Sequence, residues 1–486
     1  MNRQQTMTGV GQSGCQVTTA QDADQSFASA IRERVVAARM HSARGLAAVR
    51  ICVGLLVAML STMVRGADED GAKPLFNGKD LTGWVRVNCA PETFTVREGM
   101  IVSTGKPTGV LRTEKMYENF VLDIEWRHMN PKGNAGIFVW SDSLPAPGVP
   151  FTRGIEVQVL AGHETENYTS HGDVFAIHGA TFKPDRAHPN GWMRCLPSEK
   201  RCNPAGEWNH YRIECQSGRI QLAVNGKVVS GGTESHPRVG YLCLESEGSE
   251  CHFRNLKLKE LPSSNPPESE RVAAARDFRP LYTGLDLHGW MDGPKVREHF
   301  VPKDWTLFYN GKAGDGDPHL WTIKEYGDIE LICDWRWTQK PKKKKHVVIL
   351  PSGDVAKNAQ GQPEEIEVDD GGDSGIYLRG SDKALINIWS HPIGSGEVMG
   401  YRNDTSLPKE VRAAVTPRKR ADRPIGEWNR FFITLRGDLL TVQLNGETVI
   451  ERAHLPGLPG KGRIGLHHHG APIEFANLFV HEYPAK

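Results

Sequence analysis

The chain contains two copies of one ordered series of short motifs. Leu75–Trp84 reads LFNGKDLTGW, and Leu281–Trp290 reads LYTGLDLHGW. PAGEWN at 204–209 returns as PIGEWN at 424–429, and FRNL at 253–256 returns as FANL at 475–478. A period of roughly two hundred residues is too long for a solenoid unit and fits two whole domains. The functional question is therefore which copy carries the chemistry.

Strand signals dominate both copies. Phe120–Trp126 and Ile329–Trp337 alternate apolar and polar residues, which indicates half-buried strands. Asn225-Gly226 and Asn445-Gly446 each stand between two β-rich runs and favour tight hairpin turns. Long helical periodicity is scarce. The pattern predicts an all-β protein of two tandem domains, each a β-sandwich or jelly roll.

The domain boundaries follow from composition. We place the first domain at residues 73–261 and the second at 278–484, joined by a polar, Pro-rich and charged linker at 262–277. The second copy has an insertion between Trp337 and Gly372 that includes the basic run Lys340–Lys345. We interpret this run as a solvated loop, because it is flanked by Pro and Gly residues.

Residues 1–66 are interpreted as a targeting region. Ile51–Leu60 is apolar but short for a membrane span, Arg44 and Arg50 precede it, and residues 64–66 offer a small-residue cleavage site. Met40 is an alternative true start, because it would leave a signal peptide of ordinary length. We expect export to the periplasm or the medium, with membrane association only if the segment stays uncleaved.

The charge and the cysteine and histidine spacing give no indication of a nucleic-acid-binding protein or of a metal site. The formal net charge of +1 gives no overall field for nucleic acid. Export would permit disulfides, with Cys195–Cys202 and Cys243–Cys251 as plausible pairs, although spacing leaves the connectivity open. No Cys-x-x-Cys or paired His spacing appears, so we assign no residue as a metal ligand.

The motifs and their order resemble the 3-keto-disaccharide hydrolase domains, a family with a concanavalin-like jelly-roll fold. The resemblance rests on the motifs quoted above together with GNAGIF at 133–138, GIEVQVL at 154–160, LESEG at 244–248, DSGIYLR at 373–379 and GSGE at 394–397. Such proteins are typically exported bacterial proteins linked to carbohydrate breakdown.

The resemblance implies cleavage of glycosidic bonds in sugars already oxidised at C3, with a 3-keto disaccharide or glycoside as the partner. A C3 ketone acidifies the C2 hydrogen, so a base can remove it while the C1 substituent leaves, and water then adds to the enone. This chemistry needs a general base, a group that polarises the ketone, and a proton donor. A divalent metal ion is one way to polarise the ketone, and no cofactor is certain.

In the first copy, Glu156 and Gln158 lie two residues apart and share one strand face. The family usually carries Glu-x-Gln here, so we assign both as catalytic and Glu156 as the acid/base, with Arg153 binding substrate. His171, an imidazole that can titrate near neutral pH, and Glu247 complete the catalytic set. The alternatives are an exposed strand face, a surface histidine and a turn-capping glutamate.

The two copies differ where chemistry is expected. Trp140 stands where the second copy has the family's usual arginine, Arg379, and we assign both to substrate binding. Asn387 aligns with Gln158, whereas a leucine, Leu385, aligns with Glu156. We assign Asn387 and Glu397 to substrate binding in the second copy.

Three histidines at 467–469 take the place of the Glu-Ser-Glu run. They cannot all face one way on a strand, so we do not expect them to form a metal site by themselves.

Three functions remain open on the sequence. The preferred one is a 3-keto-glycoside-cleaving enzyme with an active first copy. The second is a pair of lectin-like carbohydrate-binding domains without catalysis. The third is a conventional two-carboxylate glycosidase, which would use Glu156 with Glu247 if their strands are adjacent.

Overall fold

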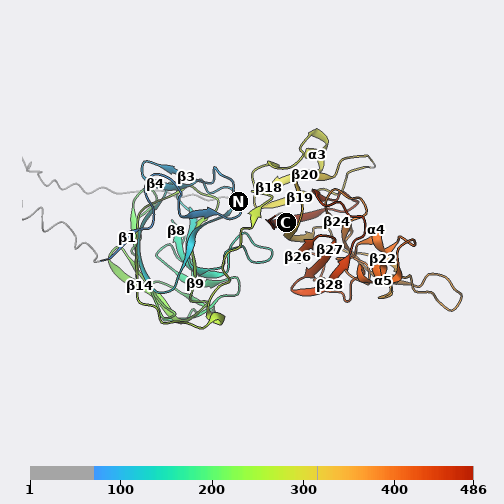
Figure 1. Cartoon of the computed structure of the whole chain (residues 1–486). Helices are drawn as coiled ribbons and strands as arrows, with labels where there is room; N and C mark the ends of the chain where they lie inside the picture. The colour runs from blue at the N-terminus through green and yellow to red at the C-terminus, as the bar shows by residue number, and fades with distance from the viewer. Residues whose placement is uncertain (1–70, 315, 485–486) are drawn as a thin grey trace, which may run out of the picture. The chain divides into compact units, whose positions relative to one another are not determined.

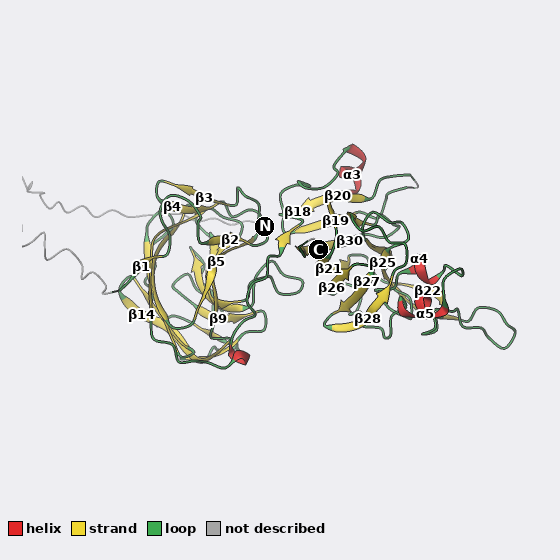
Figure 2. Cartoon of the chain, in the orientation of Figure 1, coloured by secondary structure: helices red, strands yellow, loops and turns green. Residues whose placement is uncertain are grey.

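A computed structural model describes residues 71–314 and 316–484 of the chain. Each copy is a sandwich of two antiparallel sheets with few helices, which confirms the predicted tandem all-β fold (Figures 1 and 2). The predicted signal peptide lies outside the described residues. Within the described ranges, no helix combines the length and apolar character needed to cross a bilayer.

The first copy contains two sheets. The larger has the order β10-β14-β13-β12-β6-β16-β4-β3, with β1 paired to β16. Its strands are β1 (Lys73–Pro74), β3 (Phe94–Arg97), β4 (Met100–Ser103), β6 (Phe120–His128), β10 (Thr181–Pro184), β12 (Asn209–Gln216), β13 (Arg219–Val224), β14 (Lys227–His236) and β16 (Cys251–Glu260).

The other sheet of the first copy, here called site sheet 1, has the order β11-β9-β8-β7-β15-β5-β2. Its strands are β2 (Trp84–Arg86), β5 (Gly109–Tyr117), β7 (Asn134–Ser141), β8 (Gly154–Leu160), β9 (Val174–Ile177), β11 (Arg194–Cys195) and β15 (Gly240–Ser246). A 3-10 helix, η1 (Glu268–Glu270), follows in the linker.

The second copy repeats this plan with a smaller site sheet. Its large sheet has the order β18-β19-β30-β21-β26-β27-β28, with β17 paired to β30. These strands are β17 (Arg279–Pro280), β18 (Phe300–Lys303), β19 (Thr306–Tyr309), β21 (Ile329–Trp337), β26 (Asn429–Arg436), β27 (Leu439–Leu444), β28 (Glu447–His454) and β30 (Ile473–Glu482).

Site sheet 2 has the order β20-β29-β24-β25. It consists of β20 (Leu320–Tyr326), β24 (Asp373–Tyr377), β25 (Leu385–Trp389) and β29 (Gly462–Leu466). Three short helices accompany the second copy, namely α3 (Pro294–His299), α4 (Met399–Arg402) and α5 (Lys409–Ala414).

Strand alternation separates core from site. In β8, Ile155, Val157 and Val159 belong to the apolar core of the first copy, so Glu156 and Gln158 point to the opposite, outer face of site sheet 1. The second copy has its own core cluster. A third apolar cluster contains side chains from both copies.

The two Asn-Gly pairs form the predicted tight turns, since Asn and Gly both have positive φ in each.

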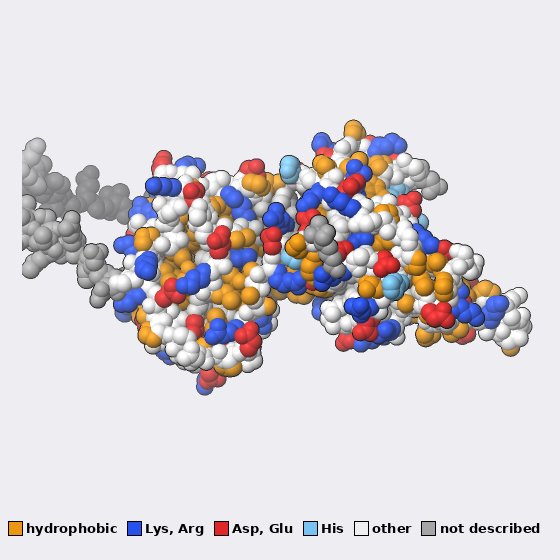
Figure 3. Space-filling model, viewed as in Figure 1, with side chains coloured by type: hydrophobic (Ala, Val, Ile, Leu, Met, Phe, Trp, Pro, Cys, Tyr) orange, Lys and Arg blue, Asp and Glu red, His pale blue; other side chains and the backbone are white. Residues whose placement is uncertain are grey.

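The insertion of the second copy differs from the prediction. Its basic run enters a strand, β22 (Lys342–Val347), which pairs with the acidic β23 (Glu365–Asp370) as a separate two-stranded sheet. Lys343 lies 3.0 Å from Asp369 across this ladder, so the charges balance locally. Figure 3 shows the wider pattern, with basic and acidic side chains interspersed over the visible face.

The structure contains neither of the two disulfides that the sequence suggested. All seven cysteines of the described residues are free thiols, including the two suggested pairs. Most are buried in the core, where burial raises the pKa of the thiol, as for Cys243 at about 11. They act as small apolar side chains in the packing.

Candidate functional site

Carboxyl groups converge on the outer face of site sheet 1. Strand β7 lies between β8 and β15, and Gly136 of β7 is directly opposite Gln158. A Cβ atom at position 136 would lie 2.7 Å from Glu245 Oε2 and 2.8 Å from Glu156 Oε1. Because any other residue would collide with both carboxyl groups, the glycine makes room for them to meet above the strand.

A hydrogen-bonded chain extends from this cluster along the sheet. Asn134 donates to Glu247 and accepts a bond of 2.9 Å from Gln158 Nε2. Gln158 Oε1 accepts from Arg194 at 2.9 Å, and Arg194 also donates to the buried Asp173 at 2.8 Å. Each member is oriented by the next, which fixes the side chains around the carboxyl cluster.

The environment changes the protonation of the cluster. Burial, and then the nearby Glu247 carboxyl, raise the pKa of Glu156 to about 8. Burial and the neighbouring carboxyls also raise the pKa of Glu245 well above its usual value. Burial raises the pKa of the more accessible Glu247 as well, and its hydrogen bonds with Glu245 and Asn134 oppose this rise. At neutral pH Glu156 therefore retains a proton that it can donate.

The sequence prediction found only part of this arrangement. Glu156, Gln158 and Glu247 come together as expected, on strands separated by β7 rather than adjacent. Asn134 and Arg194 were not assigned. Asn134 lies inside the family motif GNAGIF at 133–138, so the motif could have identified it as a site residue. Nothing in the sequence linked Arg194 to Gln158.

An exposed aromatic rim flanks the same site and was also missed. Trp192 is 48% exposed and stacks on His188, with ring centroids 4.7 Å apart. The guanidinium of Arg194 lies 5.9 Å from the ring centre of Tyr168. An exposed indole beside hydrogen-bonding groups is suited to stacking against the apolar face of a sugar.

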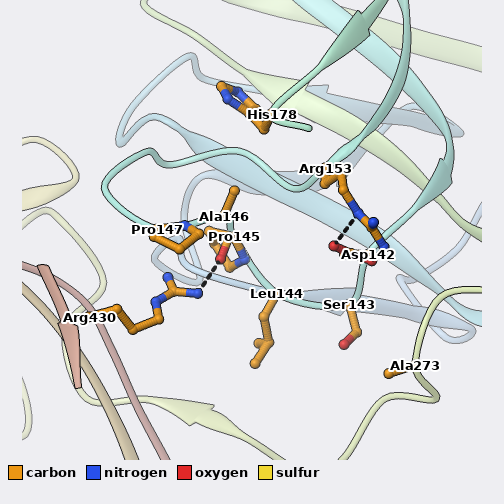
Figure 4. A pocket seen from close by; sticks show the side chains of 10 residues that line it. All are labelled: Asp142, Ser143, Leu144, Pro145, Ala146, Pro147, Arg153, His178, Ala273 and Arg430. Carbon is orange, nitrogen blue, oxygen red and sulfur yellow. Dashed lines mark hydrogen bonds and ion pairs between the residues drawn. The ribbon is translucent and has the colours of Figure 1, made fainter. Parts of the chain in front are cut away.

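Arg153 is placed apart from the carboxyl cluster. It pairs with Asp142 and lines a cavity of about 410 Å³, in which Arg430 donates to the carbonyl oxygen of Pro145 at 3.0 Å (Figure 4). His171 is likewise occupied, because its Nε2 lies 2.9 Å from Glu164 Oε1 and its Nδ1 accepts from the backbone of Cys202.

Trp140 and Arg379 correspond in structure as in sequence, since both have positive φ, at 54° and 49°. Both are buried. Trp140 donates its indole N–H to the carbonyl oxygen of Glu118 at 2.7 Å, and Arg379 donates to the carbonyl oxygens of Gly327, Gly437 and Pro459. Neither side chain presents a surface to a ligand here, so their predicted substrate-binding role is replaced by one in holding loops together.

In the second copy the same row has different chemistry. Asn387 stands opposite Gly375 as Gln158 stands opposite Gly136, and His467 donates its backbone N–H to the carbonyl oxygen of Gly375. Leu385 occupies the position in the second copy that Glu156 occupies in the first. The predicted substrate-binding Glu397 is buried, lies against Arg402 and accepts from Asn387 at 3.3 Å.

Metal binding was tested on the side-chain arrangement. Over residues 71–314 and 316–484, no three His, Cys, Asp or Glu side chains are grouped so that they could hold a metal ion. The described side chains therefore offer no donor set that fits the divalent metal named as an option.

The chain is thus a tandem β-sandwich protein whose first copy has a carboxyl cluster on its outer sheet face. The family model of the 3-keto-alpha-glucoside-1,2-lyase-like domain matches residues 71–259 and 277–481. The chain therefore belongs to this family, with one such domain in each copy. No curated protein matches the sequence significantly.

Solved structures resemble one copy at a time. A Parabacteroides distasonis protein provisionally assigned as a glycosyl hydrolase is 25% identical, with 40% of this chain and 95% of that one covered at a TM-score of 0.32. The carbohydrate-binding module CBM66 of Bacillus subtilis (14% identity, 38% and 99% covered, TM-score 0.29) and a Bacillus licheniformis beta-glucanase (14%, 39% and 99%, 0.26) are also similar.

Proposed function

We propose that the chain is a carbohydrate-active enzyme whose first copy cleaves glycosidic bonds of 3-keto sugars. The observation that carries this proposal is the carboxyl cluster of Glu156, Glu245 and Glu247, in which Glu156 and Glu245 meet above Gly136. Burial raises the pKa of all three carboxyls, and neighbouring carboxyls raise those of Glu156 and Glu245 further. Family membership supports the substrate class.

The reaction is an elimination followed by hydration. An ionised carboxylate removes the C2 proton, the electron pair forms a C1=C2 double bond, and the C1–O bond breaks. A protonated carboxyl group gives its proton to the departing oxygen. Water then adds to C1 and a proton returns to C2, so that the net change is hydrolysis and the C3 ketone is retained.

The structure suggests a division of these roles. Glu247 is the most accessible member, and its hydrogen bonds with Glu245 and Asn134 favour its ionised form, so it is the base. Glu156 is buried and protonated at neutral pH, so it is the acid. The Oε2 atom of Glu245 lacks a hydrogen-bond partner among the described residues, and as a protonated carboxyl it can donate to the ketone oxygen.

The decisive experiment measures sugar released from a 3-keto-glucoside by the full chain. We expect Glu156→Gln and Glu247→Gln each to lower kcat by roughly 100-fold or more, because each removes a proton-transfer group. The control is Glu234→Gln, which changes an exposed carboxylate on β14 and should leave turnover unchanged. Unchanged turnover in both Glu156→Gln and Glu247→Gln would contradict the assignment of these residues as the acid and the base.

A two-carboxylate glycosidase is the second candidate, favoured by one observation. Glu156 and Glu245 reach the same point above Gly136 from opposite sides, although β7 separates their strands. Reaction in D₂O distinguishes the two mechanisms. Elimination and hydration place solvent deuterium at C2 of the product, whereas displacement at C1 leaves the C2 hydrogen in place. Binding of glycans without any product would instead indicate a lectin-like pair.

We further propose that the enzyme acts outside the cytoplasm. The motivating feature is the apolar segment at 51–60, with arginines before it and a small-residue site at 64–66. The mature N-terminus of the protein secreted by its host should begin at about Ala67. Recovery of the uncleaved chain from the cytoplasm alone would overturn this location.

A further inference from the structure

The loop between β7 and β8 reaches from the first copy onto the second. β7 ends at Ser141 and β8 begins at Gly154, whereas the corresponding strands of the second copy, β24 and β25, are joined by the shorter segment 378–384. Gly136 lies on β7 and Glu156 on β8, so this loop joins two of the strands on which the carboxyl cluster is built. The contacts that hold the loop therefore bear on the site.

Buried polar groups of the second copy hold the tip of this loop. Asp334 of β21 is completely buried, forms an ion pair with Arg430 of β26 and accepts the backbone N–H of Gly148 at 2.8 Å. Arg430 in turn donates to the carbonyl oxygen of Pro145 (Figure 4). Gly148 lies so close to Trp428 that a Cβ atom would be 2.4 Å from its ring. Hydrogen bonds and close packing together fix the loop tip.

Asn477 of β30 adds a second set of bonds to the loop. Its Nδ2 atom lies 2.9 Å from the carbonyl oxygen of Val149 and 3.3 Å from that of Ala146, and it also donates to Asp334 at 2.8 Å. The corresponding asparagine of the first copy, Asn255, stands in the same motif and has the same left-handed backbone, but it is exposed. This motif position therefore holds a loop in the second copy only.

The surface that receives the loop is apolar in the second copy and charged in the first. Ile332 and Phe432 stand opposite each other on the outer face of the large sheet, in or against the third apolar cluster. The equivalent pair in the first copy is Asp123 and Arg212, which form an ion pair of 2.7 Å. Large apolar patches are seldom left in water, so this face of the second copy is suited to being covered by the loop.

The same apolar cluster extends to the carboxyl groups. Phe138 and Val110 belong to it and are completely buried, although they lie on the outer face of site sheet 1. Phe138 stands directly opposite Glu156, and Val110 directly opposite Glu245. The cover that includes the second copy therefore reaches the edge of the carboxyl cluster.

Another contact between the copies lies on the Glu247 side. Asp304, in the turn between β18 and β19, accepts from the backbone N–H and the hydroxyl of Thr108 at 2.7 and 2.6 Å. The carbonyl oxygen of Pro107, the preceding residue, accepts from Ser246 at 3.0 Å, and Ser246 directly precedes Glu247. The second copy thus contacts segments that support both the acid and the base.

We propose that the second copy is a scaffold for the reaction of the first: Asp334 and Asn477 are positioning residues that hold the β7–β8 loop and thereby keep Glu156 in place to protonate the departing oxygen. This inference rests on the proposed cleavage. An acid acts only within hydrogen-bond reach of the atom that it protonates, so a shift of about 1 Å in β8 is enough to impair it.

The choice of leaving group tests the positioning in the full chain. Methyl 3-keto-α-glucoside needs a proton on its departing oxygen, whereas 4-nitrophenyl 3-keto-α-glucoside releases a stable phenolate without one. Asn477→Ala should lower kcat roughly 10-fold or more for the methyl substrate and less than about 2-fold for the nitrophenyl substrate. Asn255→Ala is the matched control and should leave both values unchanged. Equal losses on the two substrates would overturn the positioning role.

A second variant disturbs the loop from its own side and leaves every side chain of the second copy in place. The methyl group of Gly148→Ala would collide with Trp428, so this variant should show the same dependence on the leaving group. Gly99→Ala is its control, because the two glycines have φ of 72° and 73° and position 99 has room for a Cβ atom. Equal activity of the two glycine variants on the methyl substrate would contradict the proposal.

Thiol labelling separates this inference from the cleavage itself. Cys243 is completely buried in the third apolar cluster, and its Sγ lies 3.8 Å from Oγ1 of Thr152 in the loop. Asn477→Ala and Gly148→Ala should raise the rate at which iodoacetamide alkylates Cys243 roughly 10-fold, whereas Cys333 in the core of the second copy should stay protected. Peptide mass spectrometry resolves the two sites.

The outcomes for cleavage and for positioning are then distinct. If the unaltered chain cleaves no 3-keto-glucoside, the proposed cleavage has failed, and faster labelling of Cys243 still supports the hold of the second copy on the loop. Unchanged labelling of Cys243 in both variants would overturn that hold, whatever the unaltered chain cleaves.

Discussion

The rows Gln158–Gly136–Glu245 and Asn387–Gly375–His467 occupy equivalent places in the two copies and hold different chemistry. Each has a central glycine and an amide side chain on one neighbouring strand. On the other side, carboxyls stand in the first copy and imidazoles in the second. The comparison teaches that the fold supplies a glycine over which neighbouring side chains close, the carboxyls of Glu156 and Glu245 in the first copy and Leu385 in the second. These side chains decide what is done there.

We expect the largest difference between the copies when the central glycine of each row, Gly136 or Gly375, is replaced by alanine. Gly136→Ala should lower cleavage of a 3-keto-glucoside by roughly 100- to 1,000-fold, because its methyl group displaces both Glu156 and Glu245. The equivalent Gly375→Ala change meets Leu385 instead and should leave cleavage unchanged. Steady-state release of sugar by both variants measures this. Equal losses would mean that the copies act together.

The buried arginines provide the next contrast. Arg402→Met leaves Glu397 buried without its partner and should cost roughly 3 kcal/mol of unfolding free energy at pH 8, with cleavage retained. Arg194→Met should lower the free energy of unfolding by a similar amount, because it leaves the buried Asp173 without its ion-pair partner. It should also reduce cleavage, because Gln158 loses the hydrogen-bond donor that orients it. Urea unfolding and turnover together test the contrast, with Arg418→Met at an exposed ion pair as the control.

The pH dependence of stability should differ between Glu156 and its counterpart, Leu385, which does not titrate. The folded-state pKa of Glu156 is raised from 4.5 to about 8. Its contribution to stability is therefore complete below about pH 4.5 and is lost as the pH rises through about 8.

Glu156→Gln should thus become more stable than the unaltered chain by up to about 5 kcal/mol at pH 9, with little difference at pH 4. Unfolding midpoints across this range provide the measurement. A constant difference between the two proteins at all pH values would contradict the raised pKa.

The smallest effect concerns the aromatic rim of the first copy. Trp192→Ala should raise KM about 5-fold with kcat nearly unchanged, because an exposed ring contributes about 1 kcal/mol of stacking. Val228→Ala, on a side chain 53% exposed elsewhere in the same copy, is the control. A change in kcat alone would assign Trp192 to positioning of the catalytic groups and not to binding.

Much of the fold could be predicted because its signals are local. Alternation in β8 correctly placed Glu156 and Gln158 on one face, and the Asn-Gly pairs correctly marked two hairpins. The basic run was interpreted as a loop because Pro and Gly residues flank it. It forms a strand instead, because the acidic β23 across the ladder pairs with its charges.

The site was less predictable because its members are distant in sequence. Glu156 and Glu245 meet only because β7 lies between β8 and β15, an order that no local pattern encodes. Trp140 was assigned to substrate binding, yet its ring belongs to the apolar core and its backbone is left-handed. Burial at such a position depends on the loop that covers it, and composition does not reveal that.

Strand alternation has a consequence for how such a protein can evolve. In β8 the residues at 155, 157 and 159 support the fold, while those at 156 and 158 are free to change. Two duplicated domains can therefore exchange an acid for an imidazole or a leucine on the outer face without repacking the interior. New activity needs only a few substitutions in one copy, while the other continues to serve the cell.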